Sequence, residues 1–214
     1  MIIAIDGPAG AGKTSVSKGV AASLDFVRLD TGAMYRAVAL AAKEAGVSPD
    51  DASLEQFVMA LPMRYETAGV YLDDRCVEAY IRTPEVSRLA SIYSASVGVR
   101  RGLLSLQRMI GRQQNSVVDG RDIGTVVFPD AELKVFLTAS VEERARRRWR
   151  ELALAGQTAE LSEIRAEIAA RDHADMTRDV APLKQAVDAI LIDSTNLDIT
   201  EVIETIVGLA KERA

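Results

Sequence analysis

The stretch Met1-Ile2-Ile3-Ala4-Ile5-Asp6-Gly7-Pro8-Ala9-Gly10-Ala11-Gly12-Lys13-Thr14 decides the fold. Its apolar beginning, rich in β-branched residues, is typical of one buried strand. The part that starts at Gly7 fits the pattern G-x-x-x-x-G-K-[ST] without a gap, and such glycines let backbone amides curl around a polyphosphate. Residues 15–24 can then form a helix whose positive N-terminal end faces the same anion. The order of strand, glycine-rich loop and helix predicts a phosphate-binding loop. In it Lys13 reaches the β- and γ-phosphates and the Thr14 hydroxyl binds Mg²⁺.

The composition indicates one folded domain, with or without inserts. The chain has 214 residues, of which 48% are hydrophobic, so it can bury a sizeable core. No apolar run approaches the roughly 20 residues of a membrane helix, and the first strand begins at Met1, so we expect no signal or transit peptide. A single cysteine, Cys76, excludes an internal disulfide and suits a reducing compartment. We therefore expect a cytoplasmic protein without a membrane partner.

The charge balance argues against broad binding to nucleic acid, because the formal net charge is −5. Arginine outnumbers lysine by 20 to 6. Arginine suits fork-like recognition of phosphate, but a GC-rich genome explains the ratio equally well. The lone His173 and Cys76 offer little for a metal site built on histidine or cysteine, and we interpret His173 as an ordinary loop residue.

Apolar strands alternate with helical patterns along most of the chain, which predicts an α/β fold with a five-stranded parallel sheet covered by helices on both faces. Helix signals include Gly46 as a stop, Ser140 with Glu143 as a capping box, and Asp198 with Glu201 as a second capping box that opens the final helix. The helix that carries Ile164 and Ile168 is expected to end at Arg171. The stretch Met63–Tyr80 differs and is interpreted as an inserted antiparallel meander, with Cys76-Val77-Glu78 as its last strand. The predicted parallel strands are residues 1–5, 26–29, 116–118, 132–137 and 189–192.

Ligands of such sheets bind beyond the carboxyl ends of the strands. Asp119 directly follows a buried strand, as a carboxylate that holds Mg²⁺ would, and Asp30 at another strand end competes for that role. Either aspartate could instead cap a helix. Arginines also gather near these strand ends, where they would counter the charge on a transferring phosphoryl group. These are Arg36, Arg121, Arg171 and Arg178. A further run is interpreted as mostly a solvated helix face, with one or two members reaching ATP phosphates: Arg144, Arg146, Arg147, Arg148 and Arg150.

Five segments make the chain resemble the bacterial cytidylate kinases from Ile2 to about Val207. The stretch from Asp119 to Ala131 is the most specific of them, because neither folding nor ATP binding requires its sequence. The segments are Ile5–Lys13 (IDGPAGAGK), Leu29–Arg36 (LDTGAMYR), Ile81–Val86 (IRTPEV), Asp119–Ala131 (DGRDIGTVVFPDA), and Arg171-Asp172 leading to Val180–Leu183 (VAPL).

The resemblance implies a P-loop NTPase fold and Mg²⁺-dependent transfer of the ATP γ-phosphate to CMP and dCMP. It also implies a single domain over residues 1–214, with a monophosphate-binding insert at about 63–80 and a lid at about 148–170. We expect a monomer. The implied ATP site comprises Gly7, Pro8, Ala9, Gly10, Ala11, Gly12, Lys13, Thr14 and Ser15, and the implied catalytic residues are Lys13, Arg36, Arg121 and Arg171.

The resemblance also implies an acceptor site. Arg36 and Arg121 would hold the acceptor phosphate, with help from Arg171. Ser91, Arg100 and Asp122 would read the cytosine edge. Asp175 and Arg178 would contact the sugar. Tyr35 would shape the pocket, and Asp30 belongs to the same set.

The base preference follows from hydrogen bonding. Cytosine offers an amino donor where uracil offers a carbonyl, so a buried carboxylate at Asp122 would favour CMP over UMP. Two other functions stay open. A different small-molecule P-loop kinase would share the first loop but would not need the Asp119–Asp122 segment. A regulatory nucleotide switch would be expected to carry an Asn-Lys-x-Asp motif, which the sequence lacks.

Overall fold

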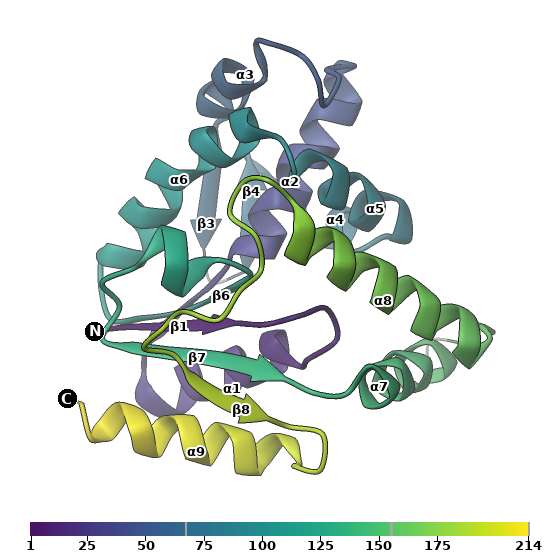
Figure 1. Cartoon of the computed structure of the whole chain (residues 1–214). Coiled ribbons are helices and arrows are strands. Elements are labelled where there is room, and N and C mark those ends of the chain that lie inside the picture. The colour runs from purple at the N-terminus through teal and green to yellow at the C-terminus, as the bar shows by residue number, and fades with distance from the viewer. Residues whose placement is uncertain (67, 155, 214) are drawn as a thin grey trace. The chain divides into compact units, whose positions relative to one another are not determined.

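The computed structural model describes residues 1–66, 68–154 and 156–213 (Figure 1). The chain divides into two compact units. The first unit comprises residues 1–28 and 115–214, and the second comprises residues 29–114. The second unit is therefore an insertion in the chain of the first. The amide of Val27 donates to the carbonyl of Asn115 at 3.0 Å, so the chain leaves and re-enters the first unit at neighbouring points.

A five-stranded sheet carries the first unit, and its parallel arrangement confirms the predicted α/β fold. β1 lies between β6 and β7, with Ile3 paired to Val117 on one side and to Leu133 on the other. β7 pairs in parallel with β8. The boundary between the units falls within β2. In sheet order the strands are β2 (Val27–Asp30), β6 (Ser116–Gly120), β1 (Ile2–Asp6), β7 (Leu133–Thr138) and β8 (Ile190–Asp193).

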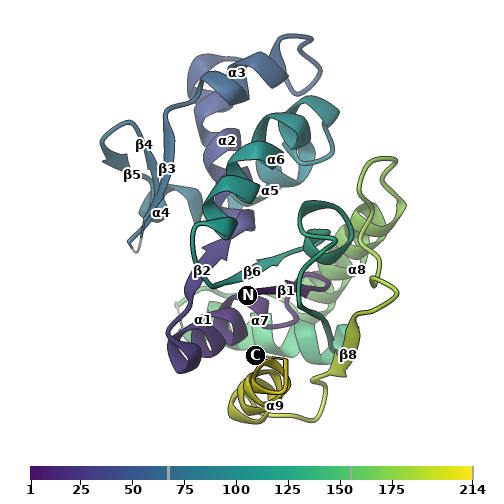
Figure 2. The same ribbon diagram turned by 90° about the vertical axis from the view of Figure 1, so that its left-hand side faces the viewer.

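Helices α1 (Lys13–Leu24) and α9 (Ile199–Lys211) lie on the same face of this sheet (Figures 1 and 2). Ile5 of β1 and Ile206 of α9 are fully buried in the core between them. The two helices pack so closely that a Cβ on Gly19 would lie 2.2 Å from the Ile203 Cδ1. The predicted capping box of α9, formed by Asp198 and Glu201, is confirmed.

Helices α7 (Val141–Leu154) and α8 (Leu161–Thr177) form a helical hairpin in the first unit. Ser140 accepts from the Glu143 amide at 3.2 Å, as predicted for a cap. Ala145, Ile164 and Ile168 fill the interface between the helices. The predicted end of this second helix at Arg171 is wrong, because no glycine or proline interrupts the chain before Pro182 and the helix runs on to Thr177. The assignment of residues 148–170 as a lid stays a prediction.

The second unit contains a three-stranded antiparallel sheet together with helices. The meander predicted for this stretch is present in the order β3-β4-β5, but its last strand ends at Cys76. Glu78 instead begins a short helix, where its carboxylate pairs with Arg82 one turn on at 2.9 Å. The elements are α2 (Thr31–Ala45), α3 (Leu54–Ala60), β3 (Met63–Glu66), β4 (Gly69–Leu72), β5 (Arg75–Cys76), α4 (Glu78–Ile81), α5 (Pro84–Tyr93) and α6 (Val97–Arg112).

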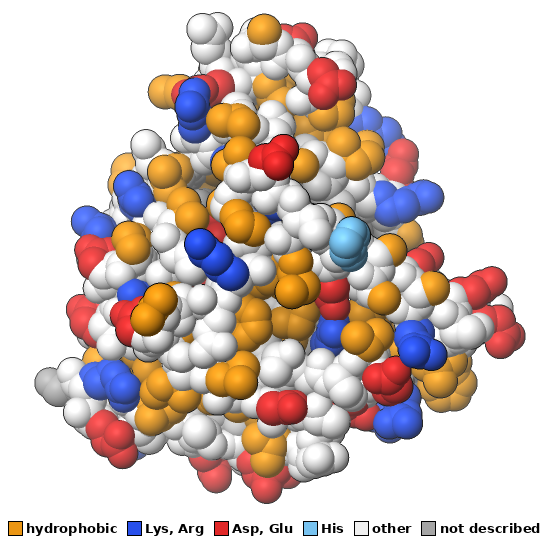
Figure 3. Space-filling model, viewed as in Figure 1, with side chains coloured by type: hydrophobic (Ala, Val, Ile, Leu, Met, Phe, Trp, Pro, Cys, Tyr) orange, Lys and Arg blue, Asp and Glu red, His pale blue; other side chains and the backbone are white. Residues whose placement is uncertain are grey.

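The surface carries charges of both signs, which are interspersed over the face seen in Figure 3. His173 is exposed on α8, so its predicted place in a loop is wrong because the helix continues to Thr177. Among the described residues, no helix is both long enough and apolar enough to cross a membrane.

Candidate active site

The phosphate loop, Gly7–Thr14, connects β1 to α1 with a backbone that only glycine accommodates at several points. Gly7, Gly10 and Gly12 have φ angles of 152°, 74° and 88°. A Cβ on Gly7 would lie 1.9 Å from the Leu137 carbonyl oxygen, so a side chain there would collide with β7. The glycines of the motif therefore have a direct structural cause.

Lys13 is buried beneath this loop, and its Nζ donates to the carbonyls of Gly7 and Pro8 at 2.7 Å each. Burial holds the pKa of Lys13 well below its usual value, and the positive charge of Arg121 adds to that effect. Asp119 and Asp6 offset part of this lowering, and a polyphosphate in the loop would add further negative charge beside Lys13.

The N-terminal end of α1 is free to receive an anion. Its first turn carries no acidic residue, and the N-cap, Gly12, has no capping side chain. Thr14 and Ser15 are exposed there. The partial positive charge of the helix end and the exposed hydroxyls therefore suit a phosphate group with its cation.

Asp119 is buried at the end of β6, where it contacts the first helix and the second strand. Its Oδ1 accepts from the Ser17 hydroxyl at 2.7 Å, and the Arg28 guanidinium lies 3.0 Å from the same oxygen. The carboxylate therefore already has a cationic partner in Arg28. Thr14 and Asp119 supply hard oxygen donors, and Mg²⁺ takes few protein ligands beside phosphate and water, so this donor set fits an ion carried by a nucleotide. Among the residues described, no group of three or more metal-ligating side chains occurs.

Asp6 fixes the turn that follows β6, a short π-helix η1 (Ile123–Val127). One carboxylate oxygen accepts from the Ile123 amide at 2.8 Å and the other from the Gly124 amide at 2.7 Å. Burial raises the pKa of Asp6 to about 6, against the lowering effect of these amides. Asp6 thereby anchors the backbone next to Asp122.

Four of the predicted acceptor residues form an arginine–aspartate cluster within the first unit: Arg121, Asp122, Asp175 and Arg178. Arg121 Nε donates to Asp175 Oδ2 at 2.8 Å. Arg178 lies 3.5 Å from both Asp122 and Asp175. Burial alone would raise the pKa of Asp175, but Arg121, Arg171 and Arg178 hold it below its usual value. Arg171, four residues before Asp175 on α8, therefore acts electrostatically on this cluster, and it also lowers the pKa of Lys13.

Apart from Arg171, the remaining predicted acceptor residues lie in the second unit. Asp30 caps α2 by accepting from the Ala33 amide at 2.9 Å, and it pairs with Arg82 at 3.1 Å. This confirms the capping role that the sequence left open for Asp30. The guanidinium of Arg100 lies 5.4 Å from the centre of the Tyr35 ring, a cation–π contact.

Arg36 and Ser91 are half-buried in this same unit. Arg36 lies on α2, one residue after Tyr35, and Ser91 lies on α5. The structure thus brings Tyr35 and Arg100 together, and it places Arg36 on the same helix as Tyr35.

The arginine run on α7 divides into two kinds of residue. Arg146, Arg148 and Arg150 have half or more of their side chains exposed, which confirms the predicted solvated face. Arg144 is buried against the phosphate loop, and Arg147 donates to the Ser194 carbonyl at 2.6 Å.

Four residues with structural roles at the site were not predicted from the sequence: Asp6, Arg28, Arg82 and Asp172. Asp6 carries a usable signal, because it is a carboxylate at the end of an apolar strand. No local sequence pattern indicates Arg28 or Arg82, because their aspartate partners are remote in the sequence.

Comparisons with known proteins agree with this geometry. A family model described as Cytidylate kinase matches residues 3–212. The chain is 49% identical over 218 residues to the cytidylate kinase of Citrifermentans bemidjiense, and the alignment covers 100% of this chain and 94% of that protein. It is 50% identical over 211 residues to the cytidylate kinase of Thermosipho melanesiensis, with 99% and 97% covered.

Two solved structures share the fold at low sequence identity. An uncharacterized protein from Eubacterium ventriosum has a TM-score of 0.55 at 10% identity, with 100% of this chain and 99% of that chain covered. A gluconokinase from Sinorhizobium meliloti has a TM-score of 0.50 at 13% identity, with 99% and 92% covered. The alignments to these two relatives and the match to the family model cover nearly the whole chain. The chain therefore belongs to the cytidylate kinase family.

Proposed function

We propose that this protein transfers the γ-phosphoryl group of ATP to CMP and dCMP, giving ADP with CDP or dCDP. The observation that carries the proposal is the match to proteins named cytidylate kinase, at about half identity over the full chain. The glycine-rich loop with its buried lysine supports it, because that arrangement suits the phosphates of a nucleotide.

The donor site consists of the phosphate loop and Ser15. The loop amides and the α1 end bind the β- and γ-phosphates, and Lys13 turns from its carbonyl partners to them. Thr14 and Asp119 would hold Mg²⁺, directly or through water, and when bound the ion neutralises phosphate charge. Because Asp119 forms an ion pair with Arg28, Thr14 is the more accessible of the two Mg²⁺ ligands.

The acceptor residues keep the roles that the resemblance implies. Arg36, Arg121 and Arg171 bind the acceptor phosphate. Asp175 and Arg178 bind the sugar, and Tyr35 with Asp30 shapes the pocket. Asp122, Ser91 and Arg100 read the base. The burial of Asp122 supports its share of this role, because a carboxylate shielded from water discriminates well between an amino group and a carbonyl.

The chemistry requires alignment more than covalent help from the protein. An oxygen of the CMP phosphate forms the new bond to the γ-phosphorus, and the bond between that phosphorus and the β,γ-bridging oxygen breaks, leaving ADP. The attacking oxygen carries negative charge at neutral pH, so no side chain has to remove a proton. Arg121 and Lys13 counter the charge that spreads over the transferring group. We place the protein in the cytoplasm, where its nucleotide substrates are made and used, and we propose that it acts as a monomer.

The test is ADP release from Mg-ATP with CMP, dCMP, UMP, AMP or GMP, beside a control without acceptor. Rapid release with CMP and dCMP alone supports both the reaction and the base assignment. Activity with UMP or AMP instead keeps the kinase but refutes the role of Asp122. No acceptor-dependent release from folded protein refutes the proposed function and favours another small-molecule kinase.

A further inference from the structure

A buried ion pair links the helical hairpin to the phosphate loop within the first unit. Arg144 lies on α7 and Asp172 on α8, and their charged atoms are 2.6 Å apart. Only 5% of the Arg144 side chain and 13% of the Asp172 side chain are exposed. Removing two charged groups from water is costly, so their burial requires partners beyond the pair itself.

Those partners belong to one residue of the phosphate loop, Ala9. Asp172 Oδ1 accepts from the Ala9 amide at 3.3 Å, and an Arg144 terminal nitrogen donates to the Ala9 carbonyl at 2.9 Å. Arg144 Nε is fixed by the Ala139 carbonyl at 2.8 Å. The peptide groups on both sides of Ala9 are therefore held by one ion pair.

The contact continues into the next residue of the loop. The ideal Cβ position of Gly10 lies 3.3 Å from the Arg144 Cβ, so α7 packs directly against the loop backbone. The loop owes its shape to its glycines, and glycine-rich backbone has many alternative conformations. A fixed Ala9 removes much of that freedom before a nucleotide binds, which lowers the entropic cost of binding.

We propose that Asp172 and Arg144 are positioning residues for the ATP site. They hold the Ala9 peptide so that the following amides of the loop point at the nucleotide phosphates. The inference rests on the proposed function for the identity of the nucleotide. The Asp172 carboxylate accepts from the phosphate loop at Ala9, whereas Asp175, one turn on, binds Arg121. Loss of the Asp172 charge therefore affects the donor and leaves the acceptor largely unchanged.

The hairpin itself offers a matched control. Glu142 and Arg165 also form an ion pair between α7 and α8, at 3.2 Å, but 52% and 62% of their side chains are exposed. The variant Glu142→Gln removes this bridge from the same two helices without touching the loop. It is compared with Asp172→Asn, which keeps the shape of the side chain and removes its charge.

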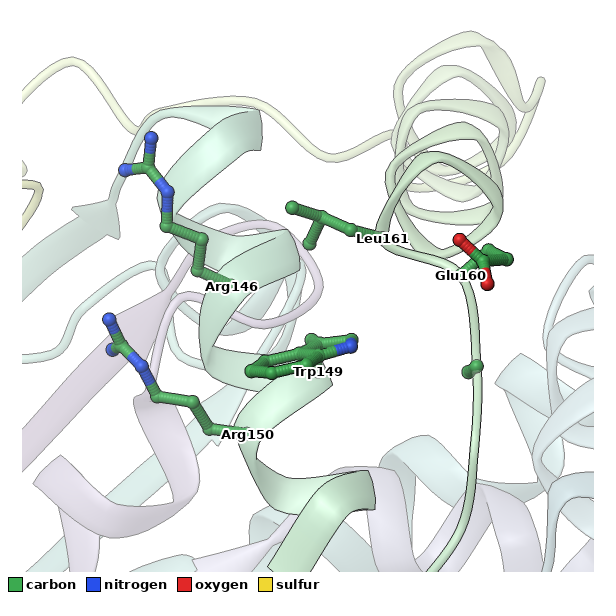
Figure 4. Close-up of a pocket in the computed structure, with 6 residues that line it drawn as sticks. Arg146, Trp149, Arg150, Glu160 and Leu161 are labelled. Atoms are coloured by element: carbon green, nitrogen blue, oxygen red, sulfur yellow. The ribbon is translucent and has the colours of Figure 1, made fainter.

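Binding can be followed without catalysis. Trp149, the only tryptophan, lies on α7 in an open pocket of about 520 Å³ with Arg146, Arg150 and Leu161 (Figure 4). Its fluorescence, in the full-length protein titrated with a non-hydrolysable ATP analogue and Mg²⁺, reports on the hairpin. We expect Asp172→Asn to raise the Kd of the analogue by about 10- to 100-fold. The KM for ATP should rise in parallel, while the KM for CMP changes less than about twofold. Glu142→Gln should match the wild type.

A merely structural role predicts a different result. If Asp172→Asn lowers the Tm but leaves the Kd of the analogue unchanged, or weakens ATP and CMP equally, the proposal is refuted. Should Asp172→Asn fail to fold, Arg144→Lys takes its place, because lysine keeps the charge but cannot reach both Ala139 and Ala9. An unchanged analogue affinity in Arg144→Lys also refutes the proposal. The binding measurement stands even if CMP proves not to be the acceptor, so the two proposals can fail separately.

Discussion

Single residues at the sheet edge combine structural and chemical roles, and Asp6 is the clearest example. It ends β1, precedes the phosphate loop and holds the amides of Ile123 and Gly124. Its carboxylate is buried beside that of Asp122, and both burial and this neighbour raise its pKa. Small changes of protonation at Asp6 therefore act on the loop and on the predicted base-reading residue together.

The raised pKa of Asp6 predicts a pH dependence of stability. Its pKa is 3.8 when unperturbed and about 6 in the fold, so its contribution is fully present below pH 3.8 and is lost as the pH rises through 6. The loss amounts to about 3 kcal/mol across this window. The variant Asp6→Asn lacks this titration, so its free energy of unfolding relative to the wild type should increase between pH 4 and 7. Urea unfolding of both proteins at several pH values measures this, and a constant difference would refute it.

Base selection is expected to depend on Asp122. In Asp122→Asn an amide that can donate replaces an acceptor-only carboxylate, so the preference for CMP over UMP should fall by at least about 100-fold. The ratio of kcat/KM for the two acceptors measures it. Asp179→Asn is the control, because Asp179 is exposed and lies next to Arg178 in sequence. An unchanged ratio in Asp122→Asn would remove Asp122 from the base site.

Sequence reasoning succeeded at residues whose role is set by local pattern. The phosphate loop could be predicted because its glycines and Lys13 stand at fixed spacing. The sequence pattern could not distinguish Arg144 from Arg148, because both lie on one polar helix and differ only in the residues that surround them. Arg144 meets Ala9 and Asp172, while Arg148 meets Glu151 at the surface.

Whole elements were predictable where their ends carry chemical signals. Asp198 with Glu201, Ser140 with Glu143 and the glycine at residue 46 all mark helix ends that the structure contains. The π-helix η1 was not predicted, because it has no sequence period and depends on Asp6 to fix its first amides. The last strand of the meander was predicted to reach Glu78, because β-branched Val77 favours a strand, but β5 ends at Cys76 and Glu78 begins α4. The pairing of Glu78 with Arg82 is not visible in a local sequence period.

The packing of α9 against the sheet predicts how substitutions in this helix change the free energy of unfolding. Ile206 is fully buried, so Ile206→Ala should lower the free energy of unfolding by about 2–5 kcal/mol. Ile199 lies on the same helix with 49% of its surface exposed, and Ile199→Ala should cost less than about 1 kcal/mol. Chemical denaturation compares the two. Equal losses would show that α9 does not seal the core as the structure indicates.

For the whole molecule, the burial of Lys13 lowers stability without nucleotide, whereas the same side chain is expected to strengthen nucleotide binding. This amine contacts two carbonyls, and its charged form is disfavoured first by burial and then by the neighbouring arginines. Lys13→Met removes a buried charge, so the free energy of unfolding without nucleotide should change by less than about 2 kcal/mol. With Mg-ATP at 100 times its Kd, the wild type should gain about 2.7 kcal/mol, and the variant should gain little. Thermal unfolding with and without Mg-ATP tests both parts, and equal gains would contradict the role of Lys13.

The hydrogen bond between Val27 and Asn115 brings together the two points where the chain leaves and re-enters the first unit. Because the two ends of the inserted segment are held side by side, the segment between them can vary in length without moving these ends. The part of this segment that follows β2, residues 31–114, can therefore change in length or sequence while the parallel sheet and phosphate loop keep their register. A changed acceptor site and an unchanged phosphate loop would then both follow from the way this segment is connected.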